Sequence, residues 1–200
     1  MFLFAGLGNP GQNCTMSRHN VGFMAVDLLA KSYDFPIWQK KAASLQTAGQ
    51  IDRSKIILVK PQSYMNKSGL PVAEVARFHR IPANHIFVFH DDLDLTAGRV
   101  RVKQGGGHGG HNGLRDIDRH LGQDYWRIRI GIGRPDNPEM DIKSWVLADF
   151  TKMETSGWLT DLLRAISDEA PRLTTHDDSG FMSRIAFLAP PPKPPQIETQ

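Results

Sequence analysis

Side chains that could activate a water molecule recur along the chain. His19 stands near the start of a helical pattern, and Asp91 follows an apolar run that ends two residues earlier, at Phe89. A neutral imidazole is basic near neutral pH, and a carboxylate bonded to its far nitrogen fixes the tautomer and stabilises the imidazolium. Asparagine amides can hold a water or polarise a carbonyl without carrying charge, and loops supply them at Asn9, Asn66 and Asn112. Together these residue types predict hydrolysis by an activated water.

Two other chemistries compete for the same residues. His90, His108 and His111, with carboxylates nearby, could ligate a metal ion, but their H-x-x-H spacing lies in a glycine-rich loop and no cysteine pair accompanies it. Cys14, the single cysteine, is close in sequence to His19 and could act as a nucleophile, although a buried, inert cysteine is the commoner case. We favour the metal-independent alternative and expect local hydrogen bonding from the histidines of the glycine-rich loop.

The stretch from 105 to 113, GGGHGGHNG, contains too many glycines for a packed helix or strand. Glycine loses the most backbone entropy when it is ordered, so such a run is typical of a loop that brings its backbone close to a ligand. The chain has no G-x-x-x-x-G-K-[ST] pattern, and in the G-x-G-x-x-G-like stretch at 6–11 Pro10 removes a backbone amide donor. The sequence therefore predicts no nucleotide cofactor.

Charges are unevenly distributed around this loop, although the net charge of the chain is only +3. The charged residues between positions 99 and 115 are all basic: Arg99, Arg101, Lys103 and Arg115. The acidic cluster DDLD at 91–94 lies directly before them. A solvated strand edge would account for the basic run, and so would a surface that faces phosphate beside a carboxylate-bearing site.

The elements that must position these residues alternate between strands and helices. Apolar or alternating patterns predict strands at 2–7, 56–59, 86–89, 100–103 and 126–132. Helical spacing predicts helices at 17–31, 70–80, 112–121 and 152–166, with Ser17 as the first N-cap. The alternation predicts an α/β fold, a single domain with a mixed, mostly parallel sheet flanked by helices. Polar motifs that follow several strands would then meet at the carboxyl ends of the sheet, where such folds bind ligands.

Composition restricts the class of protein further. The chain has 200 residues, 40% hydrophobic and 22% charged, which is typical of one globular domain rather than a disordered segment. No apolar run approaches the roughly 20 residues of a membrane helix. A single cysteine fits a reducing compartment, so the sequence predicts a cytoplasmic protein that engages no membrane. A proline-rich segment at 189–200 predicts an extended tail beyond a domain at 1–188.

Six motifs occur in order along the chain: GLGNPG at 6–11, SRHNVG at 17–22, PQSYMNKSG at 61–69, HDDLD at 90–94, the glycine-rich stretch continued to 116, and RIGIGRP at 129–135. This ordered set resembles the motifs of the bacterial peptidyl-tRNA hydrolase family. The resemblance covers residues 2 to about 187. It implies a monomeric, metal-independent, cytoplasmic enzyme without a cofactor. Its substrate would be peptidyl-tRNA dropped from ribosomes, in which it cleaves the ester between the peptide and the 3′ ribose.

The resemblance also assigns roles, position by position. It implies that His19 is the general base and that Asp91 is the carboxylate that orients it. The residues that it places along the substrate-binding crevice are Asn9, Met65, Asn66 and Asn112. The two residues that it implies for binding the tRNA 5′ phosphate are Lys103 and Arg129.

The chain departs from the family pattern at two positions. Cys14 stands where a tyrosine is usual, which removes an aromatic ring that could support the tRNA 3′ end, and Ser17 replaces a threonine. Neither change touches His19 or Asp91. A tRNA-binding protein without catalysis would share the basic face, but it would not need this histidine–aspartate pair.

Overall fold

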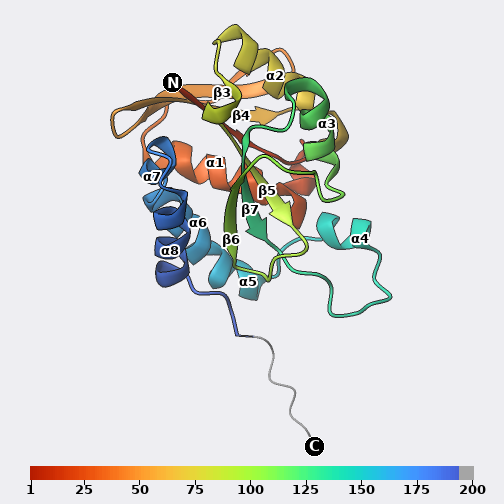
Figure 1. The fold of residues 1–200 in the computed structure, drawn as a ribbon. Coiled ribbons are helices and arrows are strands. Elements are labelled where there is room, and N and C mark those ends of the chain that lie inside the picture. The colour runs from red at the N-terminus through yellow and green to blue at the C-terminus, as the bar shows by residue number, and fades with distance from the viewer. Residues whose placement is uncertain (194–200) are drawn as a thin grey trace, which may run out of the picture.

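A computed structural model describes residues 1–193 and shows a seven-stranded sheet with helices on both faces (Figure 1). The strands are β1 (Phe2–Gly6), β2 (Gln39–Lys41), β3 (Ser44–Ile51), β4 (Ser54–Pro61), β5 (Ile86–Asp92), β6 (Val100–Gln104) and β7 (Trp126–Gly131). The α-helices are α1 (Val21–Ser32), α2 (Gly69–Phe78), α3 (Asn112–Leu121), α4 (Ile142–Leu147), α5 (Lys152–Ser156), α6 (Trp158–Asp168), α7 (Pro171–Thr174) and α8 (Asp178–Leu188). Short 3-10 helices are η1 (Gln12–Cys14), η2 (Arg18–Asn20), η3 (Met65–Lys67) and η4 (Ala83–His85).

The strand order is β2-β3-β4-β1-β5-β7-β6. The four central strands, β4, β1, β5 and β7, pair in parallel, while β3 and β6 run against their neighbours. The sheet is therefore mixed and mostly parallel in strand direction, and the predicted α/β fold class is confirmed. A parallel centre requires crossover connections. Helices α1, α2 and α3 lie in the connections from β1 to β4, from β4 to β5 and from β5 to β7, and they cover both faces of the sheet.

Both faces of the central strands are buried because successive side chains point to opposite sides of the sheet. In β1, Phe2 and Phe4 pack in a core with residues of α1, α6 and α8. Leu3 and Ala5 pack in a second core with residues of α2 and α3. Figure 1 shows these two helix layers on opposite sides of the sheet. Burial on both faces explains the continuous apolar runs seen in the sequence.

The structure corrects two details of the predicted elements. Ser17 does not cap α1, because its hydroxyl donates to the carbonyl of Cys14 at 3.0 Å and α1 begins only at Val21, after η2. The predicted helix at 152–166 is divided at Gly157 into α5 and α6. The remaining predicted strands and helices correspond to observed elements, with ends shifted by a few residues.

The C-terminal segment leaves α8 without further regular structure in residues 190–193. Pro191 and Pro192 lie close to the backbone of Gly98. Residues 194–200 of the predicted proline-rich tail lie outside the described residues, so the division into a domain at 1–188 and a tail at 189–200 stays a prediction. Among the helices of residues 1–193, none has the length and apolar character needed to cross a membrane.

Candidate active site

A cleft of about 660 Å³ lies at the carboxyl ends of the parallel strands. Asn9 follows β1, Met65 follows β4 and Asp91 lies at the end of β5, so segments distant in sequence converge there. The cleft brings together all eight side chains predicted from the sequence: Asn9, His19, Met65, Asn66, Asp91, Lys103, Asn112 and Arg129.

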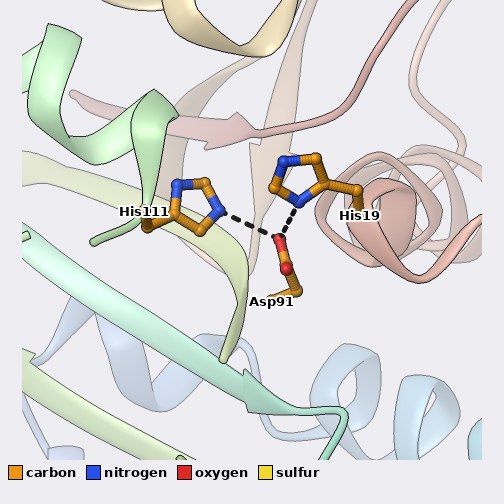
Figure 2. A group of neighbouring side chains, drawn as sticks. All are labelled: His19, Asp91 and His111. Carbon is orange, nitrogen blue, oxygen red and sulfur yellow. Dashed lines mark hydrogen bonds and ion pairs between the residues drawn. The ribbon is translucent and has the colours of Figure 1, made fainter. Parts of the chain in front are cut away.

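His19 and Asp91 form a hydrogen bond inside this cleft. Nδ1 of His19 lies 2.8 Å from Oδ1 of Asp91 (Figure 2). The carboxylate is 3% exposed and the imidazole 12%, so the aspartate is buried behind a histidine that still reaches the cleft. A neutral imidazole that donates from Nδ1 carries its lone pair on Nε2. This is the nitrogen that could take a proton from water.

The η2 turn that carries His19 is anchored on both sides. Arg18, 3% exposed, pairs with Glu154 at 2.8 Å, and its guanidinium lies 3.8 Å from the centre of the Trp145 ring. On the other side, the amide of Asn20 accepts from the backbone N–H of Asn9 at 2.8 Å and donates to the carbonyl of Asn9 at 2.9 Å. These contacts fix the backbone on either side of the imidazole.

A second imidazole reaches the same carboxylate oxygen. Nε2 of His111 lies 2.9 Å from Oδ1 of Asp91 (Figure 2). His111 is the N-cap of α3, and its Nδ1 accepts from the backbone N–H groups of Gly113 at 3.1 Å and Leu114 at 3.3 Å. Because Nδ1 is an acceptor, the proton of the neutral ring must lie on Nε2, which donates to the aspartate.

The buried groups of this cluster have displaced pKa values. Burial by itself would raise the pKa of the Asp91 carboxyl, but its interactions with His19 and His111 outweigh burial and hold that pKa well below its usual range. Burial, followed by the proximity of His111, lowers the pKa of His90 to about 3. Nδ1 of this neutral His90 donates to the Asp91 carbonyl at 2.7 Å. The cluster therefore holds an anionic carboxylate beside a neutral buried ring.

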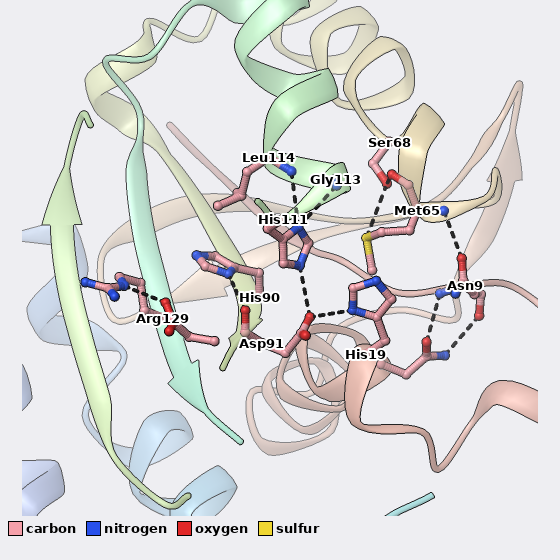
Figure 3. A network of polar contacts seen from close by, with 12 residues as sticks. Asn9, His19, Met65, Ser68, His90, Asp91, His111, Gly113, Leu114 and Arg129 are labelled. Carbon is pink, nitrogen blue, oxygen red and sulfur yellow. Dashed lines mark hydrogen bonds and ion pairs between the residues drawn. The ribbon is translucent and has the colours of Figure 1, made fainter. Parts of the chain in front are cut away.

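The asparagines differ in how firmly they are held. Oδ1 of Asn9 accepts from the backbone N–H of Met65 at 2.8 Å (Figure 3), so its Nδ2 is the group left to donate. Asn66 and Asn112 are exposed at the cleft. Asn112 begins α3, and its Oδ1 accepts from Arg115 at 3.3 Å. Each side chain can present an amide donor to a bound ester.

The glycine-rich loop forms one wall of the cleft. Four of its glycines have the left-handed φ values that favour glycine: Gly105 at 69°, Gly106 at 96°, Gly109 at 55° and Gly110 at 83°. His108 makes the expected local hydrogen bond, with its Nδ1 accepting from the backbone N–H of Gly110 at 3.1 Å. His111 goes beyond that expectation, because it also binds Asp91.

A basic wall lies next to this loop, on β6 and β7, with Lys103 close to Gly106. Lys103 is exposed and forms no ion pair with any residue of the described chain. Nε of Arg129 lies 2.7 Å from Oδ2 of Asp92. Arg127, the register partner of Lys103, is buried on the same face of the sheet and pairs with Asp118 of α3 at 3.0 Å.

Three side chains of the cleft offer atoms close enough to hold a metal ion: His19, Asp91 and His111. This set shares only His111 with the three histidines considered from the sequence. A metal at Nε2 of His111 would need the lone pair there and a proton on Nδ1, where two backbone N–H groups already donate. The hydrogen bonds of these three side chains therefore suit proton transfer better than the binding of a metal ion.

The residues that the sequence analysis left without a role are those that hold the others in place. They are Arg18, Asn20, Asp92 and, in its contact with Asp91, His111. Each lies within two residues of a predicted site residue, and that proximity is the only signal that the sequence offered.

Comparison with known proteins shows which family the chain belongs to. A family model described as peptidyl-tRNA hydrolase matches residues 3–193. The chain belongs to the peptidyl-tRNA hydrolase family. It is 52% identical to peptidyl-tRNA hydrolase of Rhodospirillum centenum over 193 residues, 96% of this chain and 84% of the relative. It is 45% identical to that of Dinoroseobacter shibae, over 96% of this chain and 81% of the relative.

A solved peptidyl-tRNA hydrolase also matches in three dimensions. The crystal structure from Acinetobacter baumannii superposes with a TM-score of 0.86 at 35% sequence identity, covering 95% of this chain and 96% of that one. The resemblance inferred from the six ordered motifs is thereby confirmed.

Proposed function

We propose that this protein hydrolyses the ester bond of peptidyl-tRNA, with His19 as the general base. The observation that carries the proposal is the 2.8 Å hydrogen bond from Nδ1 of His19 to the buried Asp91, which leaves Nε2 as the basic nitrogen in the cleft. Membership of the family supports the substrate, since the matched relatives are named peptidyl-tRNA hydrolase.

In the proposed reaction, Nε2 of His19 removes a proton from a water molecule as the water oxygen attacks the ester carbonyl carbon. Asp91 stabilises the resulting imidazolium through Nδ1. The tetrahedral intermediate then collapses, and the 3′ oxygen of the ribose leaves with the proton that the imidazolium returns. General base action of this kind contributes about 10²–10⁴-fold.

Amide donors would stabilise the negative charge on the intermediate. Nδ2 of Asn9 is a candidate, because the Met65 contact fixes the orientation of its side chain. An oxyanion donor contributes roughly 10²–10³-fold. Asn66 and Asn112, with Met65 as an apolar wall, would bind the peptide end of the substrate.

The basic wall would bind the tRNA. Lys103 and Arg129 line the same cleft as His19, which suits a clamp on the 5′ phosphate beside the acceptor end. Because all eight residues line one cleft of one chain, we expect a monomer, working in the cytoplasm where translation supplies the substrate. Lys103→Ala should weaken tRNA binding and make it less dependent on salt, with the chemistry largely retained.

The decisive experiment measures release of N-acetyl-amino acid from N-acetyl-aminoacyl-tRNA, with excess EDTA, by the wild type and by His19→Ala. We expect release by the wild type and turnover lower by at least about 10²-fold in the variant, with tRNA still bound. Near wild-type turnover by the variant would show that another group is the base. Release only after a divalent metal is added would favour a metal-dependent hydrolase, and tRNA binding without release would favour a binding protein.

A further inference from the structure

The proposed phosphate clamp contains an acid. Asp92 is the last residue of β5, and Arg129 lies on the neighbouring strand β7. Arg129 is the register partner of His90, and Asp92 stands two residues further along β5, so the side chains of Asp92 and Arg129 share one face of the sheet. Their ion pair, with 2.7 Å between Nε and Oδ2, follows from that register.

This ion pair is directional. Asp92 contacts Arg129 through Nε alone, and the two terminal nitrogens of the guanidinium make no hydrogen bond within residues 1–193. The planar guanidinium can bind a phosphate with two parallel hydrogen bonds only when one edge is presented to it. The contact with Asp92 occupies the inner nitrogen and leaves that edge available.

The carboxylate of Asp92 is itself held in place. Its Oδ1 accepts from the backbone N–H of Asp94 at 2.9 Å, while Oδ2 accepts from Arg129. The side chain of Asp92 is 12% exposed and that of Arg129 is 31% exposed. A fixed, partly buried acceptor of this kind restricts the rotamers of a long arginine side chain, which a free surface pair does not.

The neighbouring pair is a natural comparison. Arg134 and Asp94 are also 2.7 Å apart, but both side chains are 61% exposed. Lys103, across the clamp, is exposed and supplies charge without a fixed direction. Arg127, the register partner of Lys103, is itself buried against Asp118, at 3% exposure. Arg129 differs from both arginines, because it is partly exposed in the cleft and has a partly buried partner.

We propose that Asp92 is a positioning residue that sets how strongly the cleft discriminates tRNA with a 5′ phosphate from tRNA without one. It acts through Arg129, whose free edge it aims at the phosphate beside Lys103. Because the ion pair neutralises part of the arginine charge, discrimination depends on directed hydrogen bonds rather than on charge alone. This inference rests on the proposed function for its ligand, but it requires binding only and not hydrolysis.

The test measures the dissociation constants of deacylated tRNA with and without its 5′ phosphate, for the wild type and Asp92→Asn. In asparagine an NH2 group replaces one of the two oxygens that accept from Asp94 N–H and Arg129 Nε, so one of these two hydrogen bonds is lost. We expect the ratio of the two constants to fall by about tenfold in the variant, which corresponds to losing well-directed charge-assisted hydrogen bonds. With N-acetyl-aminoacyl-tRNA that carries the 5′ phosphate, the same loss should lie in KM rather than kcat.

Two matched variants separate positioning from charge. Asp92→Glu keeps both acceptor oxygens and should restore most of the discrimination, whereas Asp94→Asn makes the same charge change in the same loop and should leave the ratio unaltered. Equal loss in Asp94→Asn would mean that general electrostatics explains the effect. A ratio that stays the same or rises in Asp92→Asn would show that Asp92 only competes with the phosphate.

The outcome for the wild type separates this inference from the function on which it rests. Equal affinity of the wild type for both tRNAs would overturn the positioning role and the clamp, even if the ester is hydrolysed. Loss of discrimination in Asp92→Asn would support the positioning role even if hydrolysis is absent.

Discussion

His111 Nε2 lies 2.9 Å from Asp91 Oδ1, the oxygen that also accepts from His19. One carboxylate oxygen therefore serves two imidazoles, whose ring centres are 5.1 Å apart. His111 lies at the start of α3, so the position of that helix is linked directly to the carboxylate. The contact helps to keep Asp91 anionic and fixes its rotation, two conditions that its proposed role beside His19 requires.

His111→Ala should lower kcat by about tenfold, because Asp91 loses the hydrogen bond from His111 that fixes its rotation. This loss is smaller than the one expected for His19→Ala, since Asp91 keeps its hydrogen bond to His19. It should also destabilise α3 by about 1 kcal/mol, because the cap is lost. Single-turnover kinetics and urea unfolding would measure the two effects separately. A loss of stability without any change in turnover would limit the role of His111 to capping.

Asn9→Asp should impair turnover without impairing the fold. A carboxylate oxygen can still accept from the Met65 N–H, but the amide donor is gone and a negative charge enters the cleft beside Asp91. We expect kcat/KM to fall by at least about tenfold, while the free energy of unfolding changes by less than about 1 kcal/mol. Steady-state kinetics and chemical denaturation of the same preparation decide this. Full activity would remove Asn9 from the reaction.

Two glycines of the loop provide a test of backbone strain. Gly107 and Gly110 each have open space where a Cβ would be added, but only Gly110 has a left-handed φ, of 83°. Gly110→Ala should cost about 1–2 kcal/mol and disturb His111, its neighbour, whereas Gly107→Ala should be nearly neutral. Thermal unfolding and kcat, measured for both variants, would show whether only Gly110→Ala loses stability and activity. Equal losses of stability in the two variants would contradict the argument that the left-handed φ of Gly110 sets the cost.

The buried His90 should make the protein sensitive to mild acid. Its pKa is lowered to about 3, so between pH 6.5 and 3 the unfolded chain binds a proton that the folded chain does not. The neutral His90 ring makes its full contribution to the free energy of unfolding above pH 6.5. This contribution is lost as the pH falls, by about 1.4 kcal/mol per pH unit. The free energy of unfolding, measured with urea between pH 7 and 4.5, should fall less steeply with decreasing pH in His90→Asn than in the wild type. An unchanged slope would assign acid sensitivity to other groups.

Many strands and helices could be predicted from the pattern of apolar residues, and a few could not. The apolar run of β5 ends in His90-Asp91, so both the strand and the place of its carboxylate could be predicted. The hairpin of β2 and β3 could not, because it lies at the edge of the sheet and mixes buried and exposed residues without a regular alternation. Ser17 had the residue type of an N-cap, but its backbone instead bridges to Asp149.

The candidate site also contains both contacts that the sequence could predict and contacts that it could not. His19 and Asp91 could be paired on their chemistry alone, since a base needs an orienting carboxylate. The contact of Asp92 with Arg129 could not be predicted, because it depends on the register between β5 and β7. The contact of His111 with Asp91 depends on the path of a glycine-rich loop, whose left-handed backbone no hydrophobic pattern encodes.

The anchor of Arg18 determines when in its own synthesis the protein can fix the turn that carries His19. The turn that carries His19 is among the first segments to leave the ribosome, but Glu154, which pairs with Arg18, is translated 136 residues later. A nascent chain that lacks the segment from 145 to 154 would hold His19 on a turn whose Arg18 has lost its contacts with Trp145 and Glu154. The order of translation therefore delays the full anchoring of this turn until most of the chain has been made and folded.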